Sequence, residues 1–214
     1  MSDLRALVVD FGGVLTTPLQ DSMSAFAQAE GIELQDLVRV ALTAYAGGED
    51  SLVTDFETGR IGDAEFSKEF ARRLSEVSGR QVGAERLVDR LFGGLRLEDS
   101  MLTAVERART QGFKTGLLSN SWGLDGYPME RLTPLFDVVV ISGEVGLRKP
   151  DPEIFHLTTG KLDVEASACV FVDDHPGHLQ TALALGMKTV LHRSPSQSIA
   201  ELETLLGVEL GESS

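Results

Sequence analysis

The distribution of apolar residues along the chain predicts five short β-strands. Each segment is rich in Val, Leu, Ile or Phe, and several are apolar throughout instead of alternating with polar residues. Continuous apolar runs of this length are typical of parallel strands that are covered on both faces. The predicted strands are residues 6–10, 114–119, 137–142, 169–173 and 188–192.

Stretches of helical periodicity separate the later strands, at residues 100–111, 153–162 and 177–185. Gly112 and Gly186 follow two of these stretches, and glycine commonly ends a helix because it adopts a left-handed backbone without strain. The alternation of strand and helix predicts a doubly wound α/β sheet.

The segment between the first two strands breaks this alternation and contains no convincing strand. It predicts four helices, each followed by glycine, at residues 21–30, 34–46, 63–78 and 84–92. We therefore expect a helical cap, inserted after the first strand, that lies over the sheet.

Composition and charge narrow the range of functions. The chain has 214 residues, of which 42% are hydrophobic and 24% charged, as in an ordinary globular protein. This length fits one large domain, or a core with an inserted module. The net charge of −14 repels nucleic acids and anionic membranes, so we expect neither as a partner. An anionic small-molecule substrate would need local cations at its site.

The single cysteine, Cys169, cannot form an internal disulfide, which favours a reducing compartment. It lies in an apolar run and is interpreted as a small buried hydrophobic residue. The first residues lack the features of a signal peptide, and no apolar segment approaches the roughly 18 residues that span a bilayer. We expect a cytoplasmic protein, and the sequence leaves its oligomeric state open.

Polar residues follow the predicted strands at their carboxyl ends, where open α/β sheets bind ligands. Asp10 ends the first strand, Ser119-Asn120 end the second, and Asp173-Asp174 end another. Lys149 lies in the connection between them, followed by Pro150. We expect these side chains to converge on one edge of the sheet.

Such a set of residues suits one kind of chemistry. Carboxylates that lie close together repel one another unless a cation lies between them, and Mg²⁺ prefers hard oxygen ligands. A carboxylate beside that cation can attack a phosphoryl group and form an aspartyl phosphate. A hydroxyl, an amide and a lysine can hold the phosphoryl oxygens and offset their charge.

The residues around Asp10, Ser119-Asn120, Lys149-Pro150 and Asp173-Asp174 form four motifs along the chain. In this order they resemble the four motifs of the haloacid dehalogenase superfamily, and the resemblance covers nearly the whole chain. The first motif, Asp10-Phe11-Gly12-Gly13-Val14, is similar to that of the phosphatase-like domains fused to epoxide hydrolases. The resemblance implies a three-layer Rossmann-like core, residues 1–15 and 98–210, with parallel strand order 5-4-1-2-3. It also implies an all-helical cap at residues 16–97.

The resemblance further implies a magnesium site. Asp10 would be the nucleophile and a metal ligand, and Gly12 would offer its backbone carbonyl to the metal. Asp174 resembles the acid that binds the metal directly, with Asp173 as a second or outer-sphere ligand.

The remaining motifs imply phosphoryl binding. Ser119 and Asn120 resemble the phosphoryl-binding pair, and Lys149 resembles the lysine that steadies the nucleophile and the transferred group. The function implied is a Mg²⁺-dependent phosphatase acting on a small phosphate ester through an aspartyl phosphate at Asp10.

One position departs from the phosphatase pattern, because Gly12 stands where these enzymes usually have a second aspartate, the general acid and base. Such catalysis typically contributes about 10²–10⁴-fold. Thr16, His175 and His178 are possible substitutes, and His178 itself stands where many relatives have Asn. The departure also leaves open a binding or regulatory protein with weak turnover.

A 2-haloacid dehalogenase-type hydrolase is the rival interpretation, since family dehalogenases also lack the second aspartate. They work without metal and use an arginine and aromatic residues around the halide, for which Arg39, Arg60 and Trp122 are candidates. The Asp173-Asp174 pair favours a cation instead, and the first motif lacks the aromatic residue that those dehalogenases carry.

Overall fold

The computed structural model describes residues 3–45, 51–123 and 126–211. Its centre is a parallel five-stranded sheet in the order β3-β2-β1-β4-β5, which confirms the predicted strand order. The strands are β1 (Ala6–Val9), β2 (Lys114–Ser119), β3 (Val138–Ile141), β4 (Cys169–Asp173) and β5 (Lys188–Leu191).

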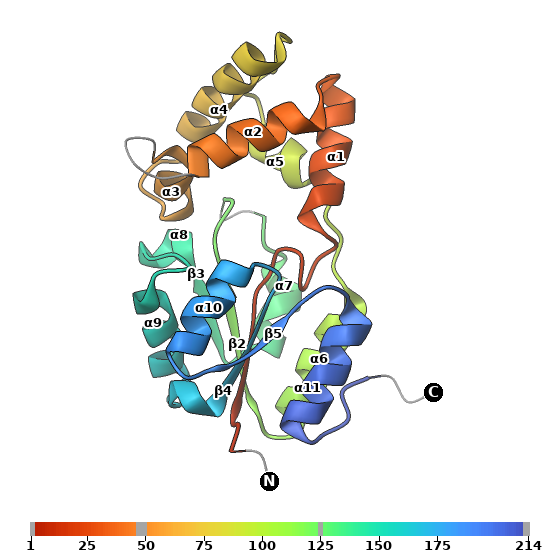
Figure 1. The fold of residues 1–214 in the computed structure, drawn as a ribbon, viewed down its shortest axis with the longest axis vertical. Coiled ribbons are helices and arrows are strands. Elements are labelled where there is room, and N and C mark those ends of the chain that lie inside the picture. Colours follow the sequence, from red (N-terminus) through yellow and green to blue (C-terminus); the bar gives the residue numbers. More distant parts are fainter. Residues whose placement is uncertain (1–2, 46–50, 124–125, 212–214) are drawn as a thin grey trace.

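Helices cover both faces of this sheet (Figure 1). One layer contains α6 (Asp99–Thr110) and α11 (Pro195–Leu206), and the other contains α9 (Pro152–Leu162) and α10 (Pro176–Ala184). The central strand β1 packs against both helical layers, because Leu7 and Val9 belong to one apolar cluster and Ala6 and Val8 to the other. Burial on both faces explains why this strand is apolar throughout.

Shorter elements complete the core. They are α7 (Met129–Leu132), α8 (Ser142–Val145) and two 3₁₀ turns, Thr133–Leu135 and Ala166–Ala168.

The insertion between β1 and β2 is helical, as predicted, and lies over the carboxyl edge of the sheet (Figure 1). Its described helices are α1 (Leu19–Glu30), α2 (Leu34–Tyr45), α3 (Leu52–Glu57), α4 (Asp63–Ser78) and α5 (Leu87–Phe92). They enclose an apolar cluster of their own. Within it Phe66 stacks between Phe56 and Phe70, at ring-centroid distances of 4.1 and 5.2 Å. The cap therefore has its own core.

The chain enters and leaves the cap side by side. Thr16 and Leu97 form an isolated antiparallel bridge, and Glu98 N donates to Leu15 O at 2.9 Å. The proposed boundaries of the cap, residues 16 and 97, fall at this bridge and stay a prediction.

Several elements differ from the sequence prediction. Helices α3 and α11 were not predicted, although Ser194 and Pro195 are a common helix start and Ser194 Oγ accepts from Gln197 N at 3.3 Å. Helix α5 begins three residues later than predicted, because Arg86 adopts a left-handed backbone with φ of 48°. Residue 46, where we ended the second cap helix, lies outside the described residues.

Two expectations from composition can be compared with the structure. Cys169 is fully buried in the apolar core, as predicted, and burial raises the pKa of its thiol to about 11. None of the helices that the structure describes is long and apolar enough to span a bilayer.

Candidate active site

The candidate nucleophile, Asp10, lies where the central strand β1 ends. Its N–H donates to Val172 O at 2.9 Å, and the neighbouring pair Val9 and Val172 are aligned in the parallel register. Asp10 and Asp173 therefore leave the sheet side by side. Asp10 is 8% exposed, and its Oδ1 accepts from Phe11 N at 2.7 Å.

A buried lysine joins these two carboxylates. Lys149 is 0% exposed, and its Nζ lies 2.8 Å from Asp10 Oδ1 and 2.7 Å from Asp173 Oδ2. Burial alone would lower the pKa of Lys149, but the two carboxylates raise it above its usual value. Although burial opposes ionisation of Asp173, Lys149 and His178 lower the pKa of this carboxyl to about 2. The lysine and Asp173 are thus both charged at neutral pH.

Asp173 is held on all sides by the protein. His178 Nδ1 lies 3.0 Å from each of its oxygens, and His175 N donates to Oδ1 at 2.7 Å. His178 lies on the face of α10 (Pro176–Ala184) that packs against Asp173, and it is 7% exposed. Both oxygens of Asp173 have partners, so the outer-sphere role proposed for it fits better than direct binding of a metal.

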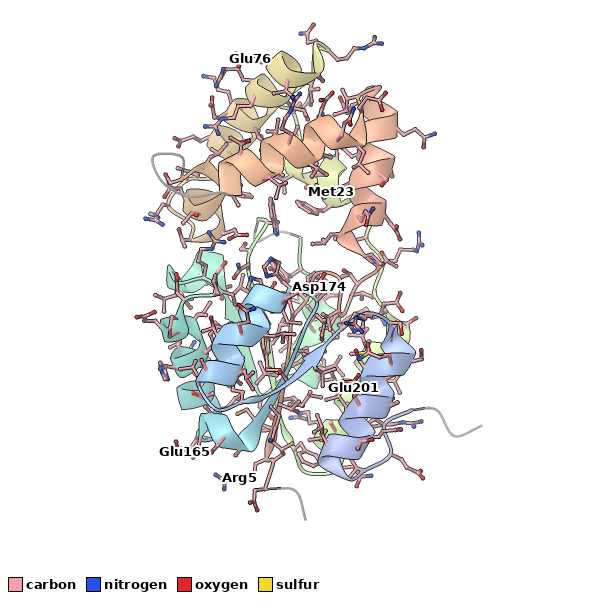
Figure 2. The ribbon with its side chains drawn as sticks, viewed as in Figure 1. Arg5, Met23, Glu76, Glu165, Asp174 and Glu201 are labelled. Carbon is pink, nitrogen blue, oxygen red and sulfur yellow. The ribbon has the colours of Figure 1, made fainter. Side chains whose placement is uncertain are left out.

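The third acid, Asp174, is exposed at the same edge, beneath the cap (Figure 2). One ligand oxygen from each of Asp10, Asp173 and Asp174 lies within 4.8 Å of the others. Burial and the neighbouring carboxylates raise the pKa of Asp10 to about 7 and that of Asp174 to about 6. A cation between them would relieve this repulsion, so the residues present fit a hard divalent metal ion.

A glycine allows the first motif to approach Asp174. Gly13 has a φ of +75°, and a Cβ built on it would lie 2.4 Å from Asp174 Oδ2. Any side chain at this position would therefore displace the carboxylate, in addition to straining the backbone.

The two residues predicted to bind phosphoryl oxygens are differently engaged. Ser119 Oγ lies 2.9 Å from Tyr127 Oη at the end of β2. The Asn120 amide spans the backbone of Lys149, because its Oδ1 accepts from Lys149 N at 2.8 Å and its Nδ2 donates to Lys149 O at 3.0 Å. The side chain of Asn120 is thus placed to orient Lys149, and its role in binding phosphoryl oxygens stays a prediction.

Three further residues at this edge were missed by the sequence analysis. Tyr127, bonded to Ser119, has its pKa raised by burial. Glu57 of the cap is 1% exposed, and its Oε2 lies 2.8 Å from Arg148 Nε. Because Arg148 directly precedes Lys149 in the sequence, it could have been predicted to lie near the site. The sequence around Glu57 and around Tyr127 has no motif or periodicity that would have indicated a role for either residue.

A cavity of about 1040 Å³ lies between the cap and the segments that follow β1, β2 and β3, with Phe11, Trp122 and Gly143 among its lining residues. Its aromatic lining residues are Phe11, Phe56, Phe92, Trp122 and Tyr127. Trp122 belongs to the loop after β2, yet its ring lies 5.1 Å from that of Phe92 in the cap. Trp122 therefore both packs against the cap cluster and faces the cavity.

The three residues proposed as substitutes for the absent general acid lie in different places relative to the cavity. Thr16 lines the cavity, but its Oγ1 donates to Thr17 O at 3.0 Å. His175 is exposed and is not among the residues lining the cavity, and His178 lies behind Asp173. None of the three offers a proton directly to the cavity in this arrangement.

The arginines considered for halide binding lie elsewhere. Arg39 pairs with Asp36 and Arg60 with Asp55, each at 2.9 Å, and neither lines the cavity. Their side chains are 63% and 61% exposed, which does not suit the enclosed site that a halide requires.

Comparisons with known proteins agree with this architecture. A family model described as haloacid dehalogenase-like hydrolase matches residues 4–186. Bifunctional epoxide hydrolase 2 of Sus scrofa is 33% identical over 223 residues, which cover 97% of this chain and 40% of that protein. The chain thus spans about two fifths of the length of this relative.

Two of the solved structures that are similar to the chain show the same architecture. A predicted HAD-like family hydrolase from Porphyromonas gingivalis is 26% identical, with a TM-score of 0.72, and the match covers 97% of this chain and 100% of that one. A HAD family enzyme from Bacteroides thetaiotaomicron, solved with magnesium and inorganic phosphate, is 22% identical with a TM-score of 0.66. That match covers 89% of this chain and 94% of the other. At this identity it shows a shared fold.

Proposed function

Because this chain belongs to the haloacid dehalogenase-like hydrolase family, we propose that it is a Mg²⁺-dependent phosphatase that transfers the phosphoryl group of a small phosphate ester to Asp10. One observation carries the proposal. The buried Lys149 Nζ bridges Asp10 and Asp173, beside a third carboxylate whose pKa is raised. This arrangement holds a nucleophile in place beside carboxylates close enough to share a cation.

The contacts of Asp10 suggest which oxygen attacks. Lys149 Nζ and Phe11 N both contact Oδ1, which leaves Oδ2 to approach the phosphorus atom. Oδ2 forms a bond to phosphorus while the bond from phosphorus to the ester oxygen breaks, giving an aspartyl phosphate and an alcohol once a proton is added. Attack of water on the phosphorus then releases phosphate and restores Asp10.

The metal would be held by Asp10, Asp174 and the Gly12 carbonyl, with Asp173 acting from the outer sphere. When bound, Mg²⁺ supplies positive charge that offsets the repulsion between the carboxylates and the phosphoryl oxygens. Lys149 adds a second positive charge, and Ser119 Oγ and backbone N–H groups after β2 hold the remaining oxygens. The magnesium and phosphate in the structure of the Bacteroides thetaiotaomicron enzyme support this reading.

The ester's leaving group would occupy the cavity beneath the cap. The aromatic rings of Phe56, Phe92, Trp122 and Tyr127 give this cavity an apolar lining, which favours an alcohol with an apolar or aromatic part.

Turnover of an aryl phosphate tests the proposal, because an aryl leaving group needs little protonation. We expect hydrolysis with Mg²⁺, loss of activity with a chelator, and no turnover in Asp10→Asn. Asp99→Asn is the control, since it removes an exposed ion pair with Arg131 that is expected to contribute under about 1 kcal/mol. A folded protein that releases no phosphate under these conditions would refute the proposal.

Halide release from a 2-haloacid in the presence of chelator is the corresponding test of the dehalogenase alternative. The exposed positions of Arg39 and Arg60 do not support that alternative. A purely binding protein would retain phosphate affinity but show no turnover of the aryl ester.

The proton for the leaving group provides a sharper test at Gly12. A Cβ on Gly12 would meet Leu19 Cδ2 at 3.4 Å, which is an ordinary contact, so a side chain fits there. We expect Gly12→Asp to raise the kcat for an alkyl phosphate by about 10²-fold, the lower end of general acid catalysis, and to change aryl phosphate turnover little. Gly12→Asn, which has the same size but no acidic proton, should give no such gain.

A further inference from the structure

The cap contacts the catalytic edge at the end of α3. Glu57, the last residue of that helix, is almost completely buried at the cap–core junction. Its Oε2 lies 2.8 Å from Arg148 Nε and accepts from Asn120 Nδ2 at 3.4 Å. A cap side chain thus reaches Asn120, the residue that directly follows β2.

The contact continues from Asn120 to the nucleophile. The amide of Asn120 holds both the N–H and the carbonyl of Lys149, and Lys149 Nζ contacts Asp10 Oδ1 at 2.8 Å. Glu57, Asn120, Lys149 and Asp10 therefore form a continuous chain of polar contacts from the cap to the attacking carboxylate.

Neighbouring contacts fix the position of Glu57. Ser142 Oγ donates to Glu57 O at 2.5 Å and accepts from Ser121 N at 2.7 Å. Arg148 Nη1 donates to Thr54 Oγ1 at 2.6 Å, one turn earlier on the same helix. The end of α3 is thus attached to the core through both side chain and backbone.

Close packing reinforces this attachment immediately after the helix. A Cβ on Gly59 would lie 2.4 Å from Gly143 O, so only glycine permits the two segments to touch.

We propose that Glu57 is a positioning residue: when the cap docks, its carboxylate fixes the Asn120 amide, which in turn aims Lys149 at Asp10. Turnover then depends on a docked cap, even for a substrate too small to contact the cap. Stability offers a weaker explanation of the buried pair, because buried ion pairs contribute little net free energy of folding. The inference rests on the proposed function, since its kinetic consequence is measured as phosphatase activity.

The test separates the reach of the side chain from its charge. Glu57→Gln keeps an oxygen where Oε2 lies, whereas Glu57→Asp keeps the charge but withdraws it by one methylene. We expect Glu57→Asp to lower kcat for a small aryl phosphate by about 10–100-fold, as small misplacements of catalytic groups do, with KM within about threefold. Glu57→Gln should stay within about threefold of the wild-type kcat.

Glu30→Gln is the matched control, because Glu30 pairs with Arg90 at 3.1 Å inside the cap. It should leave both kinetic constants unchanged. If Glu57→Asp does not fold, Glu57→Met replaces it, since methionine fills similar space without a strong acceptor. Normal kcat in the folded Asp or Met variant, or a loss in Glu57→Gln as large as theirs, would overturn the proposal.

A second measurement does not depend on turnover. The Asn120 side-chain amide protons, which donate to Lys149 O and Glu57 Oε2, should exchange slowly with solvent in the wild type and in Glu57→Gln. In Glu57→Asp their exchange, followed by nuclear magnetic resonance, should be at least about tenfold faster, since a hydrogen bond contributes roughly 1 kcal/mol or more. Unchanged exchange would contradict the inference. Absence of phosphatase activity in the wild type would contradict only the proposed function.

Discussion

Charged side chains are arranged differently in the core and in the cap. At the catalytic edge Asp10, Lys149 and Asp173 are buried and share one set of contacts. In the cap Arg72 pairs with Glu69 and Glu76 along the exposed face of α4. Exposed pairs of this kind contribute about 0–1 kcal/mol, whereas a buried charge without its partner is strongly destabilising. The catalytic edge of the core thus differs from α4 of the cap in that Asp10, Lys149 and Asp173 are buried there.

The largest expected effect comes from removing the shared cation. Lys149→Met leaves two carboxylates buried without their partner, so we expect the free energy of unfolding at neutral pH to fall by about 3–5 kcal/mol. Arg72→Met removes the exposed cap pairs and should change it by less than about 1 kcal/mol. Urea denaturation measures both. Equal losses in the two variants would remove the distinction between core and cap.

Two glycines with similar backbones give a second contrast. Gly13 in the core and Gly31 in the cap have φ of +75° and +67°, but only Gly13 would place a Cβ against a carboxylate, Asp174. We expect Gly13→Ala to weaken Mg²⁺ binding by about 10–100-fold, measured by calorimetric titration. Gly31→Ala should cost about 1–2 kcal/mol of stability without a change in Mg²⁺ affinity. A Gly13→Ala protein with normal Mg²⁺ affinity would argue against a metal beside Asp174.

Trp122 joins the two regions, so its replacement should give a smaller and more selective effect. We expect Trp122→Ala to lower kcat/KM for a naphthyl phosphate by up to about tenfold and to change that for a phenyl phosphate less. Leu42→Ala, at an exposed cap position, should change neither value. Equal losses for the two substrates would mean that Trp122 does not contact the leaving group.

The smallest effect concerns the pH dependence of stability. Burial raises the pKa of Glu57 from 4.5 to about 7, although Arg148 and Lys149 lower it and Asp10 raises it further. The folded protein therefore holds this proton to higher pH than the unfolded chain, and stability falls as the pH rises from about 4.5 to 7. In chelator, the Tm of Glu57→Gln relative to wild type should rise by a few degrees (roughly 2–4 °C) between pH 5 and pH 8.

Glu69 of the cap is the control for this measurement. Its contacts with Arg72 and Arg73 lower the pKa of its carboxyl to about 2, so any contribution it makes is lost only at much lower pH. Glu69→Gln should therefore show the same Tm difference from wild type at pH 5 and pH 8. If the Tm difference from wild type changed equally with pH in both variants, burial of Glu57 would not be the cause of the pH dependence of stability.

The sheet and most of its catalytic edge could be predicted because they depend on local patterns. A strand buried on both faces is an apolar run, and the carboxyl ends of parallel strands meet at one edge, which places Asp10 beside Asp173. Glu57 and Tyr127 could not be found in this way. Their roles arise from contacts between segments far apart in the chain, and the residues around them have no distinctive periodicity.

His178 illustrates a further limit. Its position on a helix was predicted, but which side of that helix faces the sheet depends on how α10 packs. The contact with Asp173, the last residue of β4, buries the ring. Lys149 differs because its motif, and not its surroundings, identified it.

The two segments that lead into and out of the cap lie side by side, and a hydrogen bond from Glu98 N to Leu15 O joins the two pieces of the core there. Whatever is inserted there begins and ends at nearly the same point in space. The entropy of closing such a loop grows only with the logarithm of its length. Segments of very different size and sequence could thus have replaced one another at this junction during evolution, with no change in the order of the strands.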